Sequence, residues 1–477
     1  MSFQLPLDVD ENNIFFVKRS ELNGRFDPLY FKLKIDKFIS ETPFDVLKIG
    51  DCILSAKSGF GVGRQDQVDE NNGILQIRPT NIIDYGILNF DRNVYVPFNL
   101  IYSNSYFLQN GDVLFNNTNS QELVGKTAIY FSHDEKKITY SNHITVLKVN
   151  IKKIKPEYLW ILLNIYQENK IFFTICTNWN NQSGVGIDLL KSLKIPVPTI
   201  KEQNQIVDKM IAAYAAKKEK DTKVQCLLDG IDDYLLSELG IKKPEYEENS
   251  IQNRIFYRKL SEISGGRFDS PIYHRKFSLT SSIFPNKQLK DCVSINPRTS
   301  FNGVPSNTEA TFLPMENVSE VFAEADISQT RSVNDSFGYT KFIENDLVWA
   351  KITPCMQNGK SAIVSDLTNK IGFGSTEFHV FRSKSEIEIR YIHAFLRLKY
   401  LRSFAVLFFS GSAGHQRVSD IFFKKLLIPV PPLVKQTEIA DHITFIRNQA
   451  KTLLQEVKEE FEQAKKEVEA MILGDSL

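Results

Sequence analysis

The chain has 477 residues, more than a single compact core normally holds, so at least two domains are expected. Apolar residues make up 42% and charged residues 24%, as in ordinary soluble proteins, and the formal net charge of +1 excludes binding to polyanions through overall charge. Any nucleic-acid surface must therefore be local. The five cysteines are scattered and never spaced as CxxC, which predicts a reducing cytoplasm and argues against a disulfide framework or a zinc site.

The N-terminal segment "MSFQLPLDVDENN" is acidic and lacks an apolar core, so we expect no secretory signal there. No apolar run reaches membrane-spanning length, and "AVLFFS" is far too short. We therefore expect no membrane partner.

Short motifs occur twice, in the same order and at nearly constant separation. The pairs are "SELNGRFDPLY" (20–30) with "SEISGGRFDSPIY" (261–273), "GDVLF" (111–115) with "NDLVW" (345–349), "GKTAI" (125–129) with "GKSAI" (359–363), and the two copies of "IPVP" (195–198 and 428–431). Gly24 and Gly266 are 242 positions apart, the middle pairs are 234 apart and the "IPVP" copies 233 apart. Four ordered matches indicate a duplicated chain.

The first part of each repeat predicts a mixed α/β globule. Short apolar runs such as "ILQIRP", "KTAIYFS" and "HITVLKVN" alternate with Gly, Asn and Asp clusters, which is typical of strands and turns. One interior helix is expected at 156–167, and its equivalent at "RYIHAFLRLKYL" (390–401). The globules are assigned to residues 1–198 and 241–431.

A long helix follows each globule, at 199–240 and at 432–473. In the first, Thr199 and Glu202 have capping-box spacing, and Gly240 is expected as a left-handed cap with Pro244 beyond it. The second begins at Pro432, a residue suited to the first turn of a helix, and ends at Gly474.

Apolar residues in the second helix recur in steps of three and four from Ile439 to Met471, which predicts a heptad seam with one stutter. The first helix has a similar seam, weakened by "AAKKEKDTK" and by Gly230. Each helix could pack on its own globule alone, but long narrow seams favour pairing with each other. A seam of this length spans about 50 Å.

The expected fold is therefore α+β, with two similar mixed α/β domains separated by two long antiparallel coiled-coil helices around a pseudo-twofold axis. Two similar heads on a rigid spacer suit duplex DNA, whose half-sites one helical turn apart, about 34 Å, face the same side.

The doubled "GRFD" openings, twin "IPVP" endings and following Gln-containing helices (Gln203 and Gln436) resemble the specificity subunit of type I restriction-modification systems. The resemblance covers essentially the whole chain, and the doubled order carries it more than any single motif. It implies that each globule is a target-recognition domain reading one half of a split double-stranded DNA sequence, and that the paired helices set the gap.

The resemblance also implies partners. Two methyltransferase subunits would dock on the helices, and a restriction or translocase subunit would join the assembly. Adenine methylation and ATP-driven cleavage would belong to those partners, so this chain is expected to need no cofactor and no metal.

Motifs for catalysis by the chain itself are weak. "SGFGVG" (58–63) resembles the glycine-rich turn of an S-adenosylmethionine site, but "RQDQVDENNG" follows where a helix is required, and no Asn-Pro-Pro-Tyr or Asp-Pro-Pro-Tyr loop occurs. We interpret it as a recognition loop. "GKT" and "GKS" lack the upstream glycine of a phosphate-binding loop and are expected to be turns that enter strands.

"HDEKK" (133–137) is expected to be a solvated turn rather than part of a metal nuclease. His143 and His379, near or within apolar strands, are expected to be structural.

Base reading requires loop residues with suitable donors and acceptors, and phosphate contacts require Lys, Arg and small polar groups. In the first repeat the candidates are Lys57, Arg64, Gln65, Arg78, Asn81, Asn181, Gln182 and Ser183. In the second they are Arg298, Asn317, Lys351, Gln357, Asn358, Lys360, His415, Gln416 and Arg417. Fewer than half of these are expected to touch DNA.

The globules differ outside the shared motifs, which predicts a non-palindromic target. Arg25 with Asp27, and Arg267 with Asp269, are expected to organise the globule–helix junction, with phosphate contact by the arginines as the alternative.

Two other functions stay open. The chain could be a stand-alone DNA methyltransferase or nuclease, which the missing catalytic loop disfavours. It could also be a structural adaptor that holds two proteins apart, which a failure to bind DNA would favour.

Overall fold

The computed structural model describes residues 38–101, 103–132, 136–179, 182–243, 255, 257, 259, 278–411 and 416–474. Both "GRFD" motifs, with Arg25, Asp27, Arg267 and Asp269, lie outside these residues, as does most of "HDEKK". The chain divides into two compact units, which we call unit 1 (1–218 and 458–477) and unit 2 (219–457). The unit boundaries fall inside the two long helices, whereas the domain boundaries expected from the sequence separate globules from helices.

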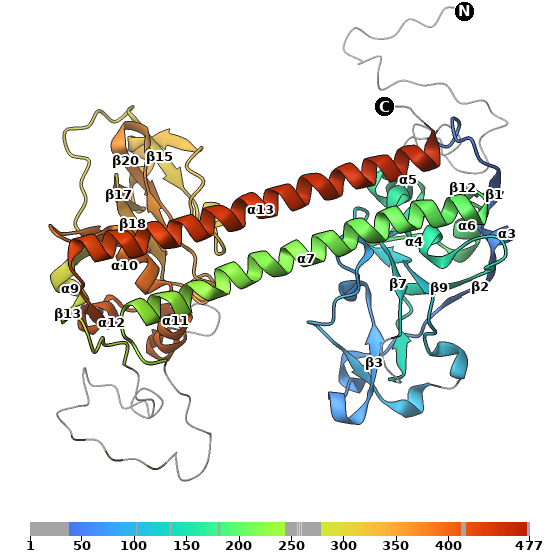
Figure 1. The fold of residues 1–477 in the computed structure, drawn as a ribbon, viewed down its shortest axis with the longest axis horizontal. Helices are drawn as coiled ribbons and strands as arrows, with labels where there is room; N and C mark the ends of the chain where they lie inside the picture. The colour runs from blue at the N-terminus through green and yellow to red at the C-terminus, as the bar shows by residue number, and fades with distance from the viewer. Residues whose placement is uncertain are drawn as a thin grey trace, which may run out of the picture. The chain divides into compact units, whose positions relative to one another are not determined.

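Unit 1 is built on a four-stranded antiparallel sheet in the order β2-β9-β5-β7. Strands β2, β9 and β7 of this sheet are labelled in Figure 1. A second sheet, β4-β3-β8, contains the parallel pair β3 and β8. The strands are β1 Val46–Lys48, β2 Ile53–Ser58, β3 Ile74–Ile77, β4 Tyr95–Val96, β5 Asp112–Asn116, β6 Thr118–Asn119, β7 Thr127–Tyr130, β8 Ile138–Tyr140, β9 Ile144–Val149, β10 Thr177–Trp179, β11 Gln182–Gly184 and β12 Lys194–Pro196. The short helices are α3 Ile49–Cys52, α4 Pro156–Glu168, α5 Ile171–Ile175 and α6 Ile187–Ser192.

Unit 2 repeats this topology with a fourth strand, β17, added to its second sheet. Its main sheet has the order β14-β21-β18-β19, and its second sheet, β16-β15-β20-β17, contains the parallel pair β15 and β20. The strands are β13 Asn286–Gln288, β14 Val293–Ile295, β15 Glu309–Leu313, β16 Thr330–Ser332, β17 Thr340–Ile343, β18 Asp346–Ala350, β19 Ser361–Val364, β20 Ile371–Gly374, β21 Phe378–Ser383, β22 Phe409–Ser410, β23 Arg417–Val418 and β24 Leu427–Pro429. The short helices are α9 Leu289–Cys292, α10 Ile389–Leu396, α11 Lys399–Ala405 and α12 Asp420–Lys425.

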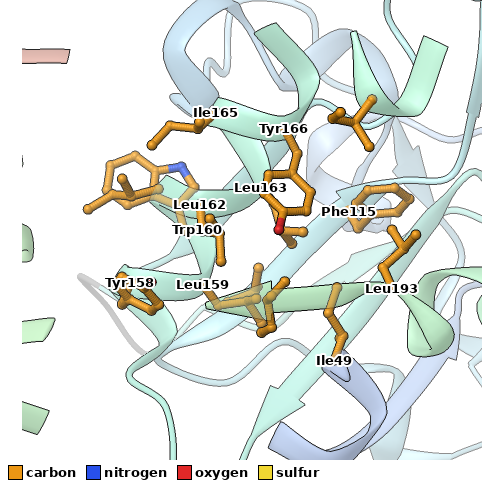
Figure 2. Packing of buried hydrophobic residues seen from close by; sticks show 14 of the residues in the cluster. Ile49, Phe115, Tyr158, Leu159, Trp160, Leu162, Leu163, Ile165, Tyr166 and Leu193 are labelled. Carbon is orange, nitrogen blue, oxygen red and sulfur yellow. The ribbon is translucent and has the colours of Figure 1, made fainter. Parts of the chain in front are cut away.

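The core of unit 1 lies between its main sheet and α4, which packs on β5 and β7. Figure 2 shows Leu159, Leu162 and Leu163 of α4 beside Phe115 of β5 and Ile49 of α3. Because α4 is buried almost all round, it behaves as a core helix rather than a surface one.

The repeated "GDVLF" and "NDLVW" motifs place a buried carboxylate at the start of the central strand in each unit. Asp112 accepts from the Gln109 N–H at 2.8 Å and pairs with Lys148, whereas Asp346 accepts from the Ile343 N–H at 2.9 Å and pairs with Arg382. Burial raises the pKa of Asp112, and the Gln109 N–H and Lys148 oppose that rise. The "GKT" and "GKS" turns do enter strands, β7 and β19, as expected.

The two "IPVP" segments form equivalent strand endings. β12 pairs with β1, and β24 pairs with β13. A buried tyrosine donates to the carbonyl of the first proline in each copy, Tyr158 to Pro196 at 2.9 Å and Tyr391 to Pro429 at 2.8 Å.

The glutamine after each "IPVP" ties the start of the long helix to its own globule. Gln203 is fully buried; its amide donates to the carbonyls of Pro198 (2.8 Å) and Lys153 (3.0 Å) and accepts from the Lys155 N–H (2.8 Å). Gln436 likewise donates to the Pro431 carbonyl at 2.9 Å and accepts from the Glu388 N–H at 3.0 Å. Each glutamine therefore satisfies backbone N–H and carbonyl groups that would otherwise lack partners at the strand-to-helix turn.

The long helices are α7, Ile200–Glu238, and α13, Leu433–Leu473. The capping box is confirmed: the Thr199 N–H donates to Glu202 Oε2 at 2.9 Å, and the Glu202 N–H to Thr199 Oγ1 at 3.4 Å. Gly240 (φ +58°) and Gly474 (φ +92°) take the left-handed conformation expected of C-terminal caps.

Within each unit, segments of α7 and α13 run antiparallel and share the core. In unit 1, Lys209 pairs with Glu467 and Tyr214 packs on Phe461 with ring centroids 5.0 Å apart. In unit 2, Lys435 pairs with Glu238 at 2.7 Å and Tyr234 packs on His442.

The helix expected at 390–401 forms as α10, but its predicted extent is wrong, because it ends at Leu396 and a second helix, α11, begins at Lys399. Asp232 of α7 accepts the Lys399 N–H at 2.8 Å and so caps the start of α11. No proline or glycine lies between α10 and α11. The break could not be predicted from the local sequence, because the capping group, Asp232, comes from a distant part of the chain.

Candidate nucleic-acid interface

In unit 1, the loop after β2 lies against the turn between β8 and β9. The Gly59 N–H donates to the Ile144 carbonyl at 3.2 Å, and a side chain on Gly59 would collide with the Tyr140 carbonyl. This close approach explains why residue 59 is a glycine. Arg64 and Gln65 follow in a single 3-10 turn and are exposed.

Arg78 and Lys57 border the same loop. Arg78 donates to Gln76 at 3.2 Å and to the Val62 carbonyl at 3.4 Å, and burial lowers the pKa of Arg78. The Lys57 ammonium lies 3.5 Å from the Tyr106 ring centroid and donates to Ser105 at 2.7 Å. Both cations are held in place, and both retain partial exposure.

Two candidates of unit 1 lie in the interior. Asn81 is 1% exposed; its amide bonds to the Arg78 N–H and the Asn89 carbonyl. Ser183 is 4% exposed and donates to Asn178. Because their polar groups are satisfied inside the protein, we do not retain them as DNA contacts. Gln182 is exposed in β11, and Asn181 lies outside the described residues.

In unit 2, the segment 351–358 is tied to β23. The Thr353 N–H donates to the Gln416 carbonyl at 3.0 Å, and the Val418 N–H to the Lys351 carbonyl at 3.0 Å. Gln357 and Asn358 are exposed on this segment, Lys351 and Gln416 are partly exposed, and His415 lies outside the described residues.

The other candidates of unit 2 vary in availability. Arg298 is exposed. Lys360 donates to the Met315 carbonyl at 3.1 Å, and Asn317 to the Asp326 carbonyl at 3.3 Å. Arg417 makes a two-pronged ion pair with Glu377 at 2.8 and 2.7 Å, so it would have to exchange partners to contact a base.

Equivalent backbone positions carry different side chains in the two units. The Val185 N–H donates to Asn117 just as the Val418 N–H donates to Lys351, so Asn117 and Lys351 correspond. By the same register, β11 of unit 1 has Gly184 where unit 2 has Arg417. One scaffold therefore presents two chemically distinct polar edges.

Sequence reasoning missed several residues on the edge of unit 1. The Asn117 amide donates to Thr145 of β9 (2.8 Å), to the Asn142 carbonyl (3.1 Å) and to Ser58 of β2 (3.3 Å), which joins two strands and the turn before β9. Trp179 is 47% exposed on the β10–β11 hairpin. Its place in "TNWNNQSG", an aromatic residue amid turn-forming amides, was an available signal for an exposed base-stacking group.

His379 is structural, as expected: Nε2 bonds to the Val418 carbonyl at 2.8 Å and Nδ1 to Asn296 at 3.0 Å. Burial lowers the pKa of His379 to about 4. His143 is partly exposed and lies beside Arg78. Its pKa is lowered, first by partial burial and second by the positive charge of Arg78.

Among the described residues, no three His, Cys, Asp or Glu side chains gather as metal ligands. A search of the same residues finds no helix with the length and apolar character needed to span a bilayer.

The profile of the type I restriction modification DNA specificity domain matches residues 66–224 and 284–463, one match in each repeat. The chain belongs to this family.

Curated relatives agree with this family. The Escherichia coli EcoEI and EcoAI specificity subunits of type I restriction enzymes are 34% and 38% identical over 153 and 162 residues. These alignments cover 32% and 33% of this chain and only 25% and 26%, about a quarter, of the relatives. The putative type I restriction enzyme MjaX specificity subunit of Methanocaldococcus jannaschii is 25% identical over 77% of this chain and 79% of its own length.

The S subunit of the type I restriction-modification system from M. genitalium aligns with 90% of this chain and 96% of its own length, at 11% identity and a TM-score of 0.44.

Proposed function

We propose that this chain is the DNA sequence-specificity subunit of a type I restriction-modification complex and that it reads a bipartite, asymmetric target. The observation that carries the proposal is one scaffold built twice with different side chains at equivalent positions: the buried Asn117 and Gly184 of unit 1 stand where unit 2 has the partly exposed Lys351 and Arg417. Different donors and acceptors select different bases. We therefore expect the two half-sites to differ in sequence.

The proposed contacts are the exposed and partly exposed candidates. In unit 1 they are Lys57, Arg64, Gln65, Arg78 and Gln182. In unit 2 they are Arg298, Asn317, Lys351, Gln357, Asn358, Lys360, Gln416 and Arg417. Arginine and lysine suit guanine and phosphate, and the amides suit adenine.

The test is single-molecule methylation sequencing of cells carrying paired variants. Arg64→Ala with Gln65→Ala should relax one half of the methylated motif, and Gln357→Ala with Asn358→Ala only the other, with about 1–3 kcal/mol lost per base contact. Each pair serves as the control for the other. A methylome unchanged by deletion of the gene would reject the proposal.

We further propose that α7 and α13 form a continuous antiparallel coiled coil that sets the gap between half-sites and binds two methyltransferase subunits, with restriction subunits joining them. The chain itself would be non-catalytic and would act in the cytoplasm. Support comes from a groove of about 890 Å³ in unit 2, bordered by Leu227, Leu453 and Phe445, which is 62% exposed. Exposed apolar surface of this kind is typical of protein interfaces.

A charge in this groove should weaken subunit docking. Phe445→Asp is expected to reduce co-purification of the methyltransferase at least tenfold, because a carboxylate would be desolvated in the interface. Phe337, 93% exposed in unit 2 and outside the helices, provides the matched control Phe337→Asp, which should co-purify normally. Equal loss in both variants would argue against docking on the helices.

The two alternatives make different predictions. A stand-alone methyltransferase or nuclease would bind S-adenosylmethionine or cut DNA as the purified chain. An adaptor would bind no DNA at any salt concentration, even within its complex.

A further inference from the structure

Three arginines lie close together in unit 2, and nearby carboxylates do not balance their positive charge. Arg397 follows α10, Arg402 lies in α11 and Arg447 in α13, with Asp232 of α7 beside them. The buried His393 adjoins Arg397 and Arg447, and burial keeps its pKa well below the usual value, so it is neutral. Arg402 donates to the Gln357 carbonyl, so the cluster contacts the 351–358 segment proposed above to bind DNA.

Backbone carbonyls satisfy two of the arginines without neutralising them. Arg397 donates to the Glu320 carbonyl at 2.7 Å and to the Gly359 carbonyl, and Arg402 to the carbonyls of Arg397 (3.0 Å) and Gln357. Arg447 forms no hydrogen bond and no ion pair within 4.0 Å to another residue of the described ranges. Its donors are therefore available to a ligand.

The nearby carboxylates are too few. Asp232 and Glu324 are the acidic groups that act on Arg447, and Glu324 is already paired with Lys451 at 2.5 Å. Lys399, which lies beside Asp232, is paired with Asp229. Burial, followed by the charges of Arg447 and Arg402, lowers the pKa of Arg397 to about 9. Burying like charges without a counter-ion is costly.

The positions of unit 1 that correspond to Arg397 and Arg447 carry uncharged residues, so the fold does not require arginines there. The offset of 233 residues that relates Tyr158 to Tyr391 and Gln203 to Gln436 places Trp160, Asn164 and Tyr214 at His393, Arg397 and Arg447. Tyr214 donates to the Tyr85 carbonyl at 2.6 Å and stacks on Trp160, with centroids 5.0 Å apart. In unit 1, the stacked rings of Trp160 and Tyr214 stand at the positions of His393 and Arg447 in unit 2.

We propose that Arg397, Arg402 and Arg447 form an oxyanion-binding site that takes a phosphate group. Guanidinium groups present planar pairs of donors that match phosphate oxygens. All three residues retain partial exposure, which a ligand needs for access. The phosphate comes either from free phosphate or from the DNA backbone, and in the second case the inference rests on the proposed function.

The test is calorimetric titration of the full chain with inorganic phosphate at constant ionic strength. Arg447→Gln should weaken binding at least tenfold, whereas Lys290→Gln, which removes an exposed charge elsewhere in unit 2, should leave it unchanged. Arg447→Tyr introduces the residue of unit 1 and should lose phosphate binding while keeping the wild-type unfolding temperature in phosphate-free buffer. Absence of binding by the wild type, or full affinity in both Arg447 variants, would overturn the proposal.

Titration with duplex DNA then identifies the source. Weaker duplex binding by Arg447→Gln, with competition by phosphate beyond a chloride control, assigns a backbone phosphate. Unchanged duplex binding with phosphate binding lost assigns free phosphate. If the proposed function failed, sequence preference would be absent, but the phosphate titration would still report on the site.

Discussion

At the scale of single residues, both repeats keep a glutamine whose side chain replaces a missing backbone partner. Gln203 and Gln436 each bridge a proline-ended strand, the preceding loop and the first turn of a long helix. Prolines stop a strand because they lack an amide donor, and the turn that follows leaves carbonyls that need donors.

Gln203→Leu is therefore expected to destabilise unit 1. The change replaces the amide with an apolar group of similar size and leaves the Lys155 N–H and two carbonyls without partners. Each buried polar group left unsatisfied should lower the free energy of unfolding by about 1–3 kcal/mol. Urea denaturation measures the loss. Gln205, exposed two residues later on the same helix, gives the control Gln205→Leu, which should change stability by less than about 0.5 kcal/mol. Similar losses in both variants would show that helix propensity, not the bridge, is responsible.

At the scale of elements, α7 carries an internal weakness that α13 lacks. Gly230 lies exposed within α7, and a Cβ there would meet no atom within 4 Å. Gly240, by contrast, has φ +58°, and a Cβ there would approach Ile283 to 2.9 Å. The same residue type thus has opposite roles ten positions apart.

Gly230→Ala should stabilise the protein by about 1 kcal/mol, because alanine loses less backbone entropy in a helix. Gly240→Ala should destabilise it by roughly 1 kcal/mol or more, because the left-handed cap and the close contact both disfavour a side chain. Thermal unfolding of the two variants gives the sign of each change. A stabilising Gly240→Ala would mean that the cap is not formed in solution.

At the scale of the whole molecule, the proposed function makes the helices a ruler. Deleting one heptad from each helix should shorten it by about 10 Å, which corresponds to roughly three base pairs of rise. Methylation at the native spacing should fail, while a library of altered spacers should reveal the same two half-sites closer together. If the native spacing were still methylated, the helices would not set the gap.

The sequence by itself determined the duplication, the mixed globules and the ends of both long helices. These features depend on local chemistry: apolar periodicity, the Thr199–Glu202 capping box, and glycines at 240 and 474 that adopt left-handed backbone. The repeated "IPVP" marked the turn, although the bridging role of the following glutamine was visible only once its three partners were in place.

Only the tertiary structure decided which polar residues are available and which charges meet. Asn81 and Ser183 looked like loop donors but are buried, Arg417 is held by Glu377, and the single helix at 390–401 is split by a cap from Asp232. Arg397 and Arg402 are close in the sequence, but Arg447 comes from α13, so no local pattern could reveal their cluster. Hydrophobic period and capping act over a few residues, whereas burial and charge balance depend on segments that only the folded chain brings together.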